Sequence, residues 1–207
     1  MWWIAYCLFI NQISTFSLDT YNTYEEIDDW LEQQGGRIIA TSKNGRNIRV
    51  VEKISTHLSV KSIMVDCGKG ASDWISITFC LNLINELANN DNDLEKVSWI
   101  ILPLLNPDGY SYTWTDDRTW QKNRGQTDNN FCPGTDLTRN YPSNWGIGGS
   151  TNPCSMDHIG SGESSEIETT AHIRQISDLL ATSQSYRSFI KISTSEAESL
   201  TNFRFIP

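Results

Sequence analysis

The fold class is decided by residues 62–105, which read SIMVDC (62–67), GKGASD (68–73), WISITFCLNLINELAN (74–89), NDNDLEK (90–96) and VSWIILPLL (97–105). The apolar runs at the two ends are typical of buried strands, and residues 97–105 lack the alternation of a half-exposed strand. Pro103 indicates that pairing of the second strand ends early. The apolar periodicity of residues 74–89 predicts a helix between the two strands, and a strand–helix–strand unit favours parallel pairing.

Helical spacing also predicts which face of residues 74–89 is buried. Ile75, Phe79, Leu83 and Leu87 recur every four residues, so we expect them to point toward the core. Ser72 precedes the helix and is a candidate N-cap.

The flanking segments extend this unit into a layered domain. Residues 106–162 are polar and rich in Gly, Asn and Pro, and so long an irregular segment is unusual unless it is functional or cross-linked. The order of elements predicts an α/β fold: a three-layer sandwich with a mixed, largely parallel sheet between helices. The expected elements are a helix over Tyr24–Gln34, a hairpin over Arg37–Thr56 with its turn at Lys43–Gly45, a helix over Ser164–Thr182 with Ile167, Ile173, Ile176 and Leu180 inward, and a strand over Phe189–Ile192.

Functional residues of such folds lie on loops beyond the carboxyl ends of the strands. Three segments qualify here: Gly68–Asp73, the long loop after Leu105 and the tail after Ile192.

Composition excludes some classes of function. The chain has 207 residues, 38% of them hydrophobic and 20% charged, which fits one globular domain. Its formal net charge of -9 opposes binding to phosphate backbones, so we expect no nucleic-acid partner.

The N-terminus carries a short apolar stretch, Trp2–Ile10. It is too short for a membrane span, which needs about 20 residues, but it suits the core of a secretory signal. We expect a signal peptide over residues 1–17, cleaved between Ser14 and Ser17, and a secreted protein. A buried N-terminal strand and an incorrect sequence start are the alternatives.

Cysteine usage agrees with an oxidising compartment. Cys7 lies in the expected leader, which leaves an even set of four. Four cysteines allow three pairings, and spacing alone does not choose among them. The remaining cysteines are Cys67, Cys80, Cys132 and Cys154.

Several motifs resemble those of the zinc metallocarboxypeptidase A/B family, peptidase family M14. They occur in the family's order from about Tyr21 to Ile192. The resemblance implies a carboxypeptidase-like fold and the disulfides Cys67–Cys80 and Cys132–Cys154. The matching stretches are Asp66–Gly68, Asp73–Ser76, Asn106–Tyr110 (NPDGY), Tyr112–Thr115, Arg118–Arg124 (RTWQKNR), Gly134–Asp136, Arg139–Asn140, Ser150–Ser155 and Ser165–Glu166.

The resemblance also implies where zinc ligands should stand. A catalytic zinc takes three protein ligands, typically two His and a Glu, plus a water. Gly70 occupies the first His position, Asp73 the Glu position and Ser193 the second His position. One carboxylate does not define a zinc site, so we expect neither zinc nor any other cofactor. None of the three histidines, His57, His158 and His172, is expected to replace a ligand, and His172 is expected on the outside of its helix.

Other family positions are partly kept. Gln121 replaces an Arg that assists the oxyanion, Ser72 another Arg, and Thr138 an Asn that grips the substrate terminus. Arg139 matches the family Arg that binds the C-terminal carboxylate of the substrate. Asp136 matches an Asp that orients a ligand His, although a loop carboxylate that accepts backbone N–H groups is the simpler interpretation.

The resemblance further implies that the chain lacks the family's C-terminal part, with its lid Tyr and general-base Glu, and its usual pro-segment. Residues 21–207 would then form a partial carboxypeptidase-like domain.

Three hypotheses for function follow. The first is a secreted, catalytically inactive carboxypeptidase-like protein that binds peptide C-termini through Arg139 or contacts a protein partner, without a membrane span. The second is an active metallocarboxypeptidase that removes C-terminal residues from peptides. The third is a partial or degenerate gene product without a stable fold.

Overall fold

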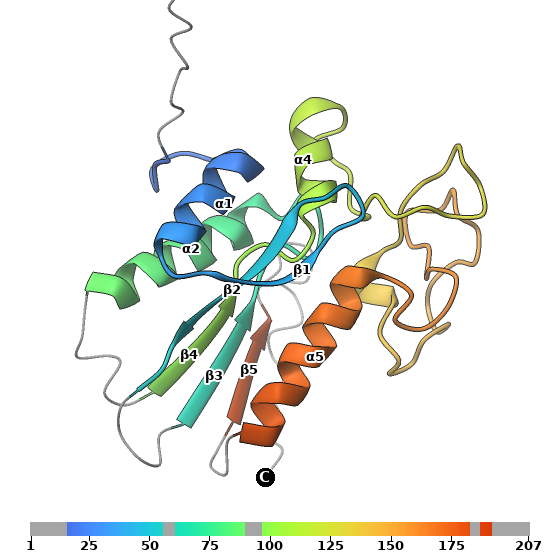
Figure 1. Ribbon diagram of the computed structural model, residues 1–207. Helices are drawn as coiled ribbons and strands as arrows, with labels where there is room; N and C mark the ends of the chain where they lie inside the picture. The colour runs from blue at the N-terminus through green and yellow to red at the C-terminus, as the bar shows by residue number, and fades with distance from the viewer. Residues whose placement is uncertain (1–15, 56–60, 90–96, 183–186, 192–207) are drawn as a thin grey trace, which may run out of the picture.

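The computed structural model describes residues 16–55, 61–89, 97–182 and 187–191, and within them one sheet carries helices on both faces (Figure 1). Residues 1–15, His57 and Ser193 lie outside the described residues. The elements are α1 (Tyr24–Gln33), β1 (Arg37–Thr41), β2 (Asn47–Lys53), β3 (Lys61–Asp66), α2 (Trp74–Asn89), β4 (Val97–Leu102), α4 (Pro107–Thr115), the 3₁₀ turn η1 (Leu137–Arg139), α5 (Ile167–Thr182) and β5 (Arg187–Lys191).

The sheet is mixed, with strand order β1-β2-β4-β3-β5. β1 and β2 form the predicted antiparallel hairpin, and β2 pairs antiparallel with β4. β3 pairs parallel with both β4 and β5, and Asp66 is opposite Leu102 at the end of the β3–β4 ladder. The carboxyl ends of β3 and β4 therefore lie at one edge of the sheet, and the loops that follow them start side by side.

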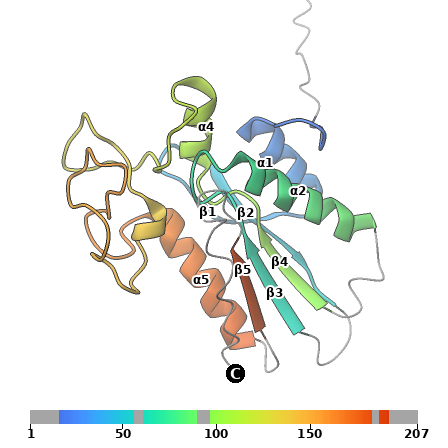
Figure 2. The ribbon, with the colours of Figure 1, turned by 180° about the vertical axis from the view of Figure 1, so that it is seen from behind.

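The three layers follow from alternation along the strands. Val65 of β3 belongs to one buried cluster with α1 and α2, whereas the preceding Met64 belongs to a second with Leu179 of α5. Because successive side chains of a strand point to opposite faces, neighbouring residues supply different cores. The two views agree: α1 and α2 cover one face of the sheet and α5 the other (Figures 1 and 2).

The predicted buried face of α2 is wrong in part, because Leu87 is buried and Leu83 packs against the first cluster, as predicted, whereas the other two residues are exposed. Ile75 is 63% exposed and Phe79 44%, while Ile77, Leu81 and Ile84 are buried. Apolar residues occur on both the buried and the exposed side of this helix, so their spacing alone does not identify the side that packs against β3 and β4.

The predicted face of α5 is wrong in part for the same reason. Ile167 and Leu180 are exposed, while Ala171 and Leu179 are buried. Ile176 is partly buried against the second cluster, as predicted.

Ser72 does not cap α2. The first bond of the helix runs from the Ile77 N–H to the Asp73 carbonyl, 3.2 Å away, so Asp73 occupies the N-cap position. The Ser72 hydroxyl instead accepts a hydrogen bond from Gln121 Nε2.

A short helix interrupts the segment that the sequence indicates as irregular. Asn106 caps α4, its side chain accepting a hydrogen bond from the Gly109 N–H at 3.0 Å, and Pro107 occupies the first turn. β4 ends at Leu102, so Pro103 does end the strand early, as predicted.

Candidate functional site

The loop from Gly68 to Asp73 is held by the start of α4. The Asn106 N–H donates to the Gly68 carbonyl at 2.9 Å, and Asn106 Nδ2 donates to the Lys69 carbonyl at 3.1 Å. Gly109 lets α4 approach the chain on its other side, because a Cβ there would lie 2.4 Å from the Lys122 carbonyl oxygen. The NPDGY motif therefore fixes the position of this loop relative to the segment that carries Gln121.

Three positions aligned with the family's chemistry meet at this loop. A Cβ on Gly70 would lie 2.9 Å from Asp73 Oδ2 and 2.9 Å from Gln121 Oε1. The Ala71 N–H also donates to the Gln121 carbonyl at 3.1 Å. Asp73 is buried, so the two side chains close over the glycine. The structure thus brings Gly70, Asp73 and Gln121 together.

These residues do not fit the family's zinc ligand set. Gly70 offers no donor atom, and the space next to its Cα is taken by the Asp73 carboxylate and the Gln121 amide. Within the described ranges, no group of three or more His, Cys, Asp or Glu side chains is placed to hold a metal ion. A carboxylate beside a neutral amide lacks the nitrogen ligands that catalytic zinc takes.

Arg139 lies at the end of η1, and its side chain is 45% exposed. Its Nε is 3.8 Å from Asp136 Oδ2, a long and partly solvated pairing. Asp136 Oδ1 accepts hydrogen bonds from the Thr138 N–H and hydroxyl at 2.9 and 2.7 Å, which fixes the turn. The Asn123 N–H donates to the Thr135 carbonyl at 3.0 Å, so the segment after Gln121 runs beside the start of this turn.

A buried polar network, which no sequence motif indicated, lies under the Gly70 loop. Lys69 Nζ is 2.7 Å from Asp66 Oδ2 and 4.8 Å from the centroid of the Tyr141 ring. The Tyr141 hydroxyl is 2.5 Å from His172 Nδ1, and His172 Nε2 is 3.7 Å from Asp66 Oδ2. The sequence feature that could have indicated this network is Lys69, which lies between two glycines in a loop that follows a buried strand.

The prediction that His172 lies on the outside of its helix is wrong. The residue is buried, with only 5% of its surface exposed. Burial lowers the pKa of its imidazole to about 4, although the nearby Asp66 opposes that shift. Burial likewise raises the pKa of the Tyr141 hydroxyl well above its ordinary value, and the Asp66 carboxylate adds to the effect.

A second unpredicted cluster joins α5 to the long loop. Asn123 Nδ2 donates to Glu166 Oε2 at 2.8 Å and to Glu168 Oε2 at 3.2 Å. Glu168 is almost fully buried, and burial with the neighbouring Glu166 charge raises its pKa to about 7. This carboxyl group is thus half protonated near neutral pH.

The disulfides connect the pairs that the resemblance implies. Cys67–Cys80 ties the end of β3 to α2, and Cys132–Cys154 closes a stretch of 22 residues in the long loop. Lys122 lies beneath that loop and donates from Nζ to the Pro153 carbonyl at 2.7 Å. Its pKa is lowered by burial and by the neighbouring Arg124 charge.

Comparison with known proteins places these features in a family. The model of a family described as zinc carboxypeptidase matches residues 36–202. The chain belongs to the zinc carboxypeptidase family. Carboxypeptidase B of Rattus norvegicus is 33% identical over 189 residues, covering 84% of this chain and 46% of the relative. Carboxypeptidase O of Bos taurus is 35% identical over 177 residues, covering 77% and 47%.

Solved carboxypeptidase structures agree with the fold. Bovine thrombin-activatable fibrinolysis inhibitor, in complex with tick carboxypeptidase inhibitor, aligns with a TM-score of 0.76 and 29% identity over 85% of this chain and 61% of that chain. Carboxypeptidase A from Helicoverpa armigera aligns with a TM-score of 0.72 and 30% identity over 80% and 45%. The carboxypeptidase-like α/β fold predicted from the sequence is confirmed. This zinc carboxypeptidase homologue spans about half the length of the relatives it matches.

The expectation of no cofactor is wrong at the level of the family. The matching family is one of zinc carboxypeptidases, so zinc is the cofactor of the family to which this chain belongs. The expectation was drawn from the residues at the three ligand positions, whereas the matching relatives are zinc carboxypeptidases.

No helix within the described residues has both the length and the apolar character that crossing a bilayer requires.

Proposed function

We propose that this zinc carboxypeptidase homologue is a secreted protein that binds peptide C-termini without hydrolysing them. The observation that carries the proposal is the group Gly70, Asp73 and Gln121. Hydrolysis in this family needs an activated water and a cationic group beside the oxyanion. Gln121 is neutral, and Gly70 has no side chain with which to bind a metal.

Peptide binding is assigned to Arg139. Its side chain is nearly half exposed, and the Asp136 carboxylate with which it pairs is 3.8 Å from its Nε, so it can bind a carboxylate ligand without breaking a close ion pair. A guanidinium can hold a terminal carboxylate through two parallel hydrogen bonds. Asp136 would keep the turn in place while Arg139 contacts the peptide.

The test compares hydrolysis with binding in the same preparation. The full chain is produced with disulfides formed and assayed, with zinc in the buffer, on peptides that end in basic, aromatic or aliphatic residues. We expect no turnover above that of a Gly70→Ala, Asp73→Ala double variant. Zinc-dependent release of C-terminal residues, abolished in that variant, would instead establish an active metallocarboxypeptidase.

Binding is measured by titrating a peptide with a free C-terminus and the same peptide with an amidated C-terminus. We expect the free form to bind and Arg139→Ala to weaken it about tenfold or more, since a hydrogen bond to a charged group contributes about 1.5–3 kcal/mol. Arg174→Ala is the matched control, because Arg174 is an exposed arginine of α5. Equal affinities for both peptides would contradict the assignment of Arg139.

Secretion is proposed from the apolar stretch at the N-terminus together with two disulfides. We propose residues 1–17 as leader and 21–207 as the carboxypeptidase-like domain. Phe16 stacks on Trp30 with ring centroids 4.4 Å apart, so cleavage after Ser14 or Thr15 would keep this contact and cleavage after Ser17 would remove it. Sequencing the N-terminus of protein recovered from the medium of expressing cells checks this, and an intact Met1 would contradict it.

A further inference from the structure

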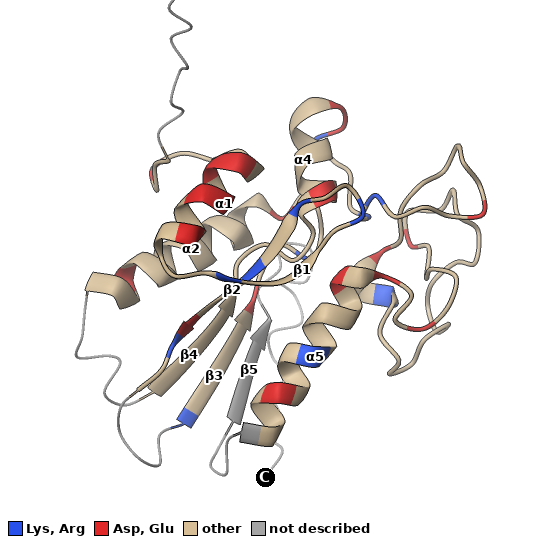
Figure 3. Cartoon of the chain, in the orientation of Figure 1, with Lys and Arg blue, Asp and Glu red and all other residues tan. Residues whose placement is uncertain are grey.

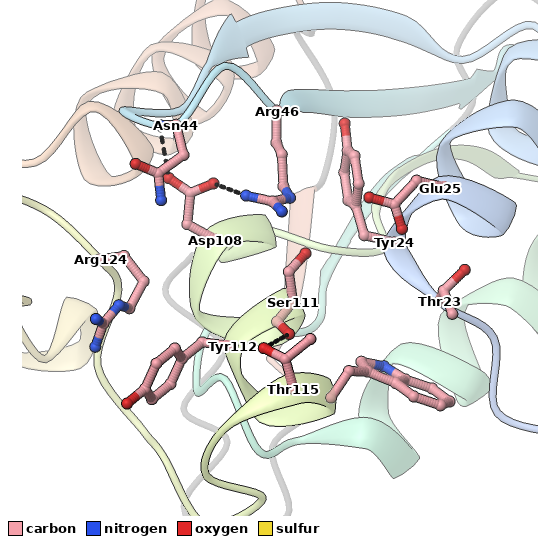
Figure 4. Close-up of a pocket in the computed structure, with 11 residues that line it drawn as sticks. Thr23, Tyr24, Glu25, Asn44, Arg46, Asp108, Ser111, Tyr112, Thr115 and Arg124 are labelled. Carbon is pink, nitrogen blue, oxygen red and sulfur yellow. Dashed lines mark hydrogen bonds and ion pairs between the residues drawn. The ribbon is translucent and has the colours of Figure 1, made fainter.

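A cavity of about 380 Å³ lies between the start of α1, the turn of the β1–β2 hairpin and α4 (Figure 4). That volume is in the range of small-molecule sites. Among the described residues that line it, neither Gly70 nor Asp73 is present, and neither is Arg139. The polar groups of its lining that could bind a ligand belong mainly to Arg46 of the hairpin, Ser111 of α4 and Arg124.

Two buried polar atoms belong to residues that line this cavity and lack hydrogen-bond partners within the described part of the chain. They are Arg46 Nε and Ser111 Oγ. In Figure 4 the Ser111 hydroxyl points toward the Arg46 guanidinium, but the two are not bonded to each other. A buried donor without a partner is costly, so a missing acceptor is expected between them.

The remaining part of the Arg46 guanidinium is already held in place. Its Nη1 donates to Asp108 Oδ1 at 3.1 Å, and Asp108 also accepts hydrogen bonds from the Ser42 hydroxyl and the Asn44 N–H, at 2.8 and 3.0 Å. The Arg46 Cζ lies 5.5 Å from the centroid of the Tyr24 ring. Because the guanidinium is planar, fixing Nη1 also fixes the direction of the Nε–H group.

Aromatic side chains form the adjoining wall of the cavity. Trp114 stacks on Trp74, which lies outside the lining, and remains 38% exposed. Tyr112 is covered by the Arg124 guanidinium, whose Cζ is 3.8 Å from the ring centroid. A ligand with an apolar body can therefore pack here while its polar end reaches Arg46 and Ser111.

The charges around the cavity limit the charge of the ligand. Two cations, Arg46 and Arg124, are balanced by two anions, Asp108 and Glu25. Figure 3 shows acidic residues along α1 and basic residues on the hairpin. A dianion such as phosphate would face two carboxylates, whereas a single carboxylate needs only the local pair of donors.

We propose that this cavity binds a small monocarboxylate with an apolar body, one carboxylate oxygen accepting hydrogen bonds from Arg46 Nε–H and Ser111 Oγ–H. The site is separate from the proposed peptide site at Arg139. Either function can fail without the other.

The test uses benzoate as the probe, followed by NMR of the arginine Nε–H resonances of the full chain labelled with ¹⁵N. The Arg46 signal is identified by its loss in Arg46→Lys. We expect benzoate to shift this resonance saturably with millimolar affinity, and the neutral benzamide to leave it unchanged. Inorganic phosphate is expected to bind more weakly than benzoate.

Ser111→Ala should weaken benzoate binding about tenfold while far-ultraviolet circular dichroism stays unchanged, since Ala favours the helix. Ser177→Ala is the control, because Ser177 is an exposed serine of α5 outside the cavity. An unmoved Arg46 resonance would mean that water alone fills the gap, and the proposal would be wrong. An equal response to benzamide, or tighter binding of phosphate, would also overturn it.

Discussion

Burial along one face of α5 changes the ionisation of two side chains, Glu168 and His172. Glu168 is held by Asn123 beside the Glu166 carboxylate, and His172 by the Tyr141 hydroxyl. Burial disfavours the charged form of each, so the pKa rises for the acid and falls for the base. Their effects on stability therefore have opposite signs.

Glu168 should make the native state less stable as pH rises. Its pKa increases from 4.5 to about 7 on folding, so between these values the native state holds a proton that the unfolded state has lost. Stability from this group is fully present below pH 4.5 and is lost as pH passes through 7. The shift corresponds to about 3 kcal/mol at 1.36 kcal/mol per pH unit.

The measurement is urea unfolding of the native chain and Glu168→Gln from pH 4 to 8. As pH rises, the unfolding free energy of the native chain should fall relative to that of Glu168→Gln. Glu163→Gln, in the exposed loop before α5, is the control. A difference independent of pH would contradict the raised pKa.

His172 should act in the opposite direction. Its pKa decreases from 6.5 to about 4, so between these values the unfolded state binds a proton that the native state excludes. Stability is present above pH 6.5 and is lost as pH falls through 4. The unfolding free energy of His172→Gln should therefore fall less steeply than that of the native chain on acidification, as followed by urea titrations at pH 7 and 4.5. Parallel pH profiles for both proteins would show that the imidazole is not held neutral.

At this scale, the sequence predicted only part of the site. The alignment of Gly70, Asp73 and Gln121 with family positions locates residues that do meet, because motif spacing carries over within a fold. It did not locate His172, whose surroundings are set by Lys69 and Tyr141, residues far away in the chain. Periodicity describes one helix and contains no information on the partner that covers it.

At the scale of elements, boundaries were predicted better than faces. α2 begins and ends where the sequence indicates, since Gly68–Asp73 before it and the polar residues 90–96 after it break the apolar pattern. Its buried face was predicted wrongly at Ile75 and Phe79, although not at Leu83 and Leu87, because apolar residues line both sides of the helix. α4 was missed although Asn106–Pro107 is a recognisable capping pair, because the surrounding segment is polar.

The long loop after α4 depends on its cross-link. Cys132 and Cys154 are 22 residues apart, so their bond restricts the unfolded chain by about 3 kcal/mol in the loop-entropy model. The double variant Cys132→Ser, Cys154→Ser should have an unfolding free energy lower by about that amount and therefore a lower urea midpoint, and its peptide affinity at Arg139 should also fall.

The control for this element is Cys67→Ser, Cys80→Ser, which removes a disulfide from the core. Both of its cysteines are almost fully buried, so this variant should lose more stability than the first, because two polar hydroxyls enter the core. If the Cys132 variant unfolded at the same urea concentration as the native chain, the loop would be held by its other contacts alone.

On the scale of the whole molecule, one sheet supports two separate cores. Ile84 belongs to the cluster under α1 and α2, and Leu105 to the cluster under α5. The strands between them supply both clusters with alternate residues. Neither core can therefore unfold without disrupting the sheet on which the other depends. We therefore expect a single cooperative unfolding transition, and the hypothesis of a chain without a stable fold predicts none.

A thermal melt tests this whole-molecule prediction on both cores. Ile84→Ala and Leu105→Ala each remove a fully buried side chain and should cost about 2–5 kcal/mol. At about 2–4 °C per kcal/mol for a chain of this size, each should lower the melting temperature by several degrees. Far-ultraviolet and near-ultraviolet circular dichroism should report the same transition in both variants.

If one variant shifted only one of two resolved transitions, the cores would be independent. A featureless melt of the native chain would mean that residues 16–191 need a further segment or a partner to fold.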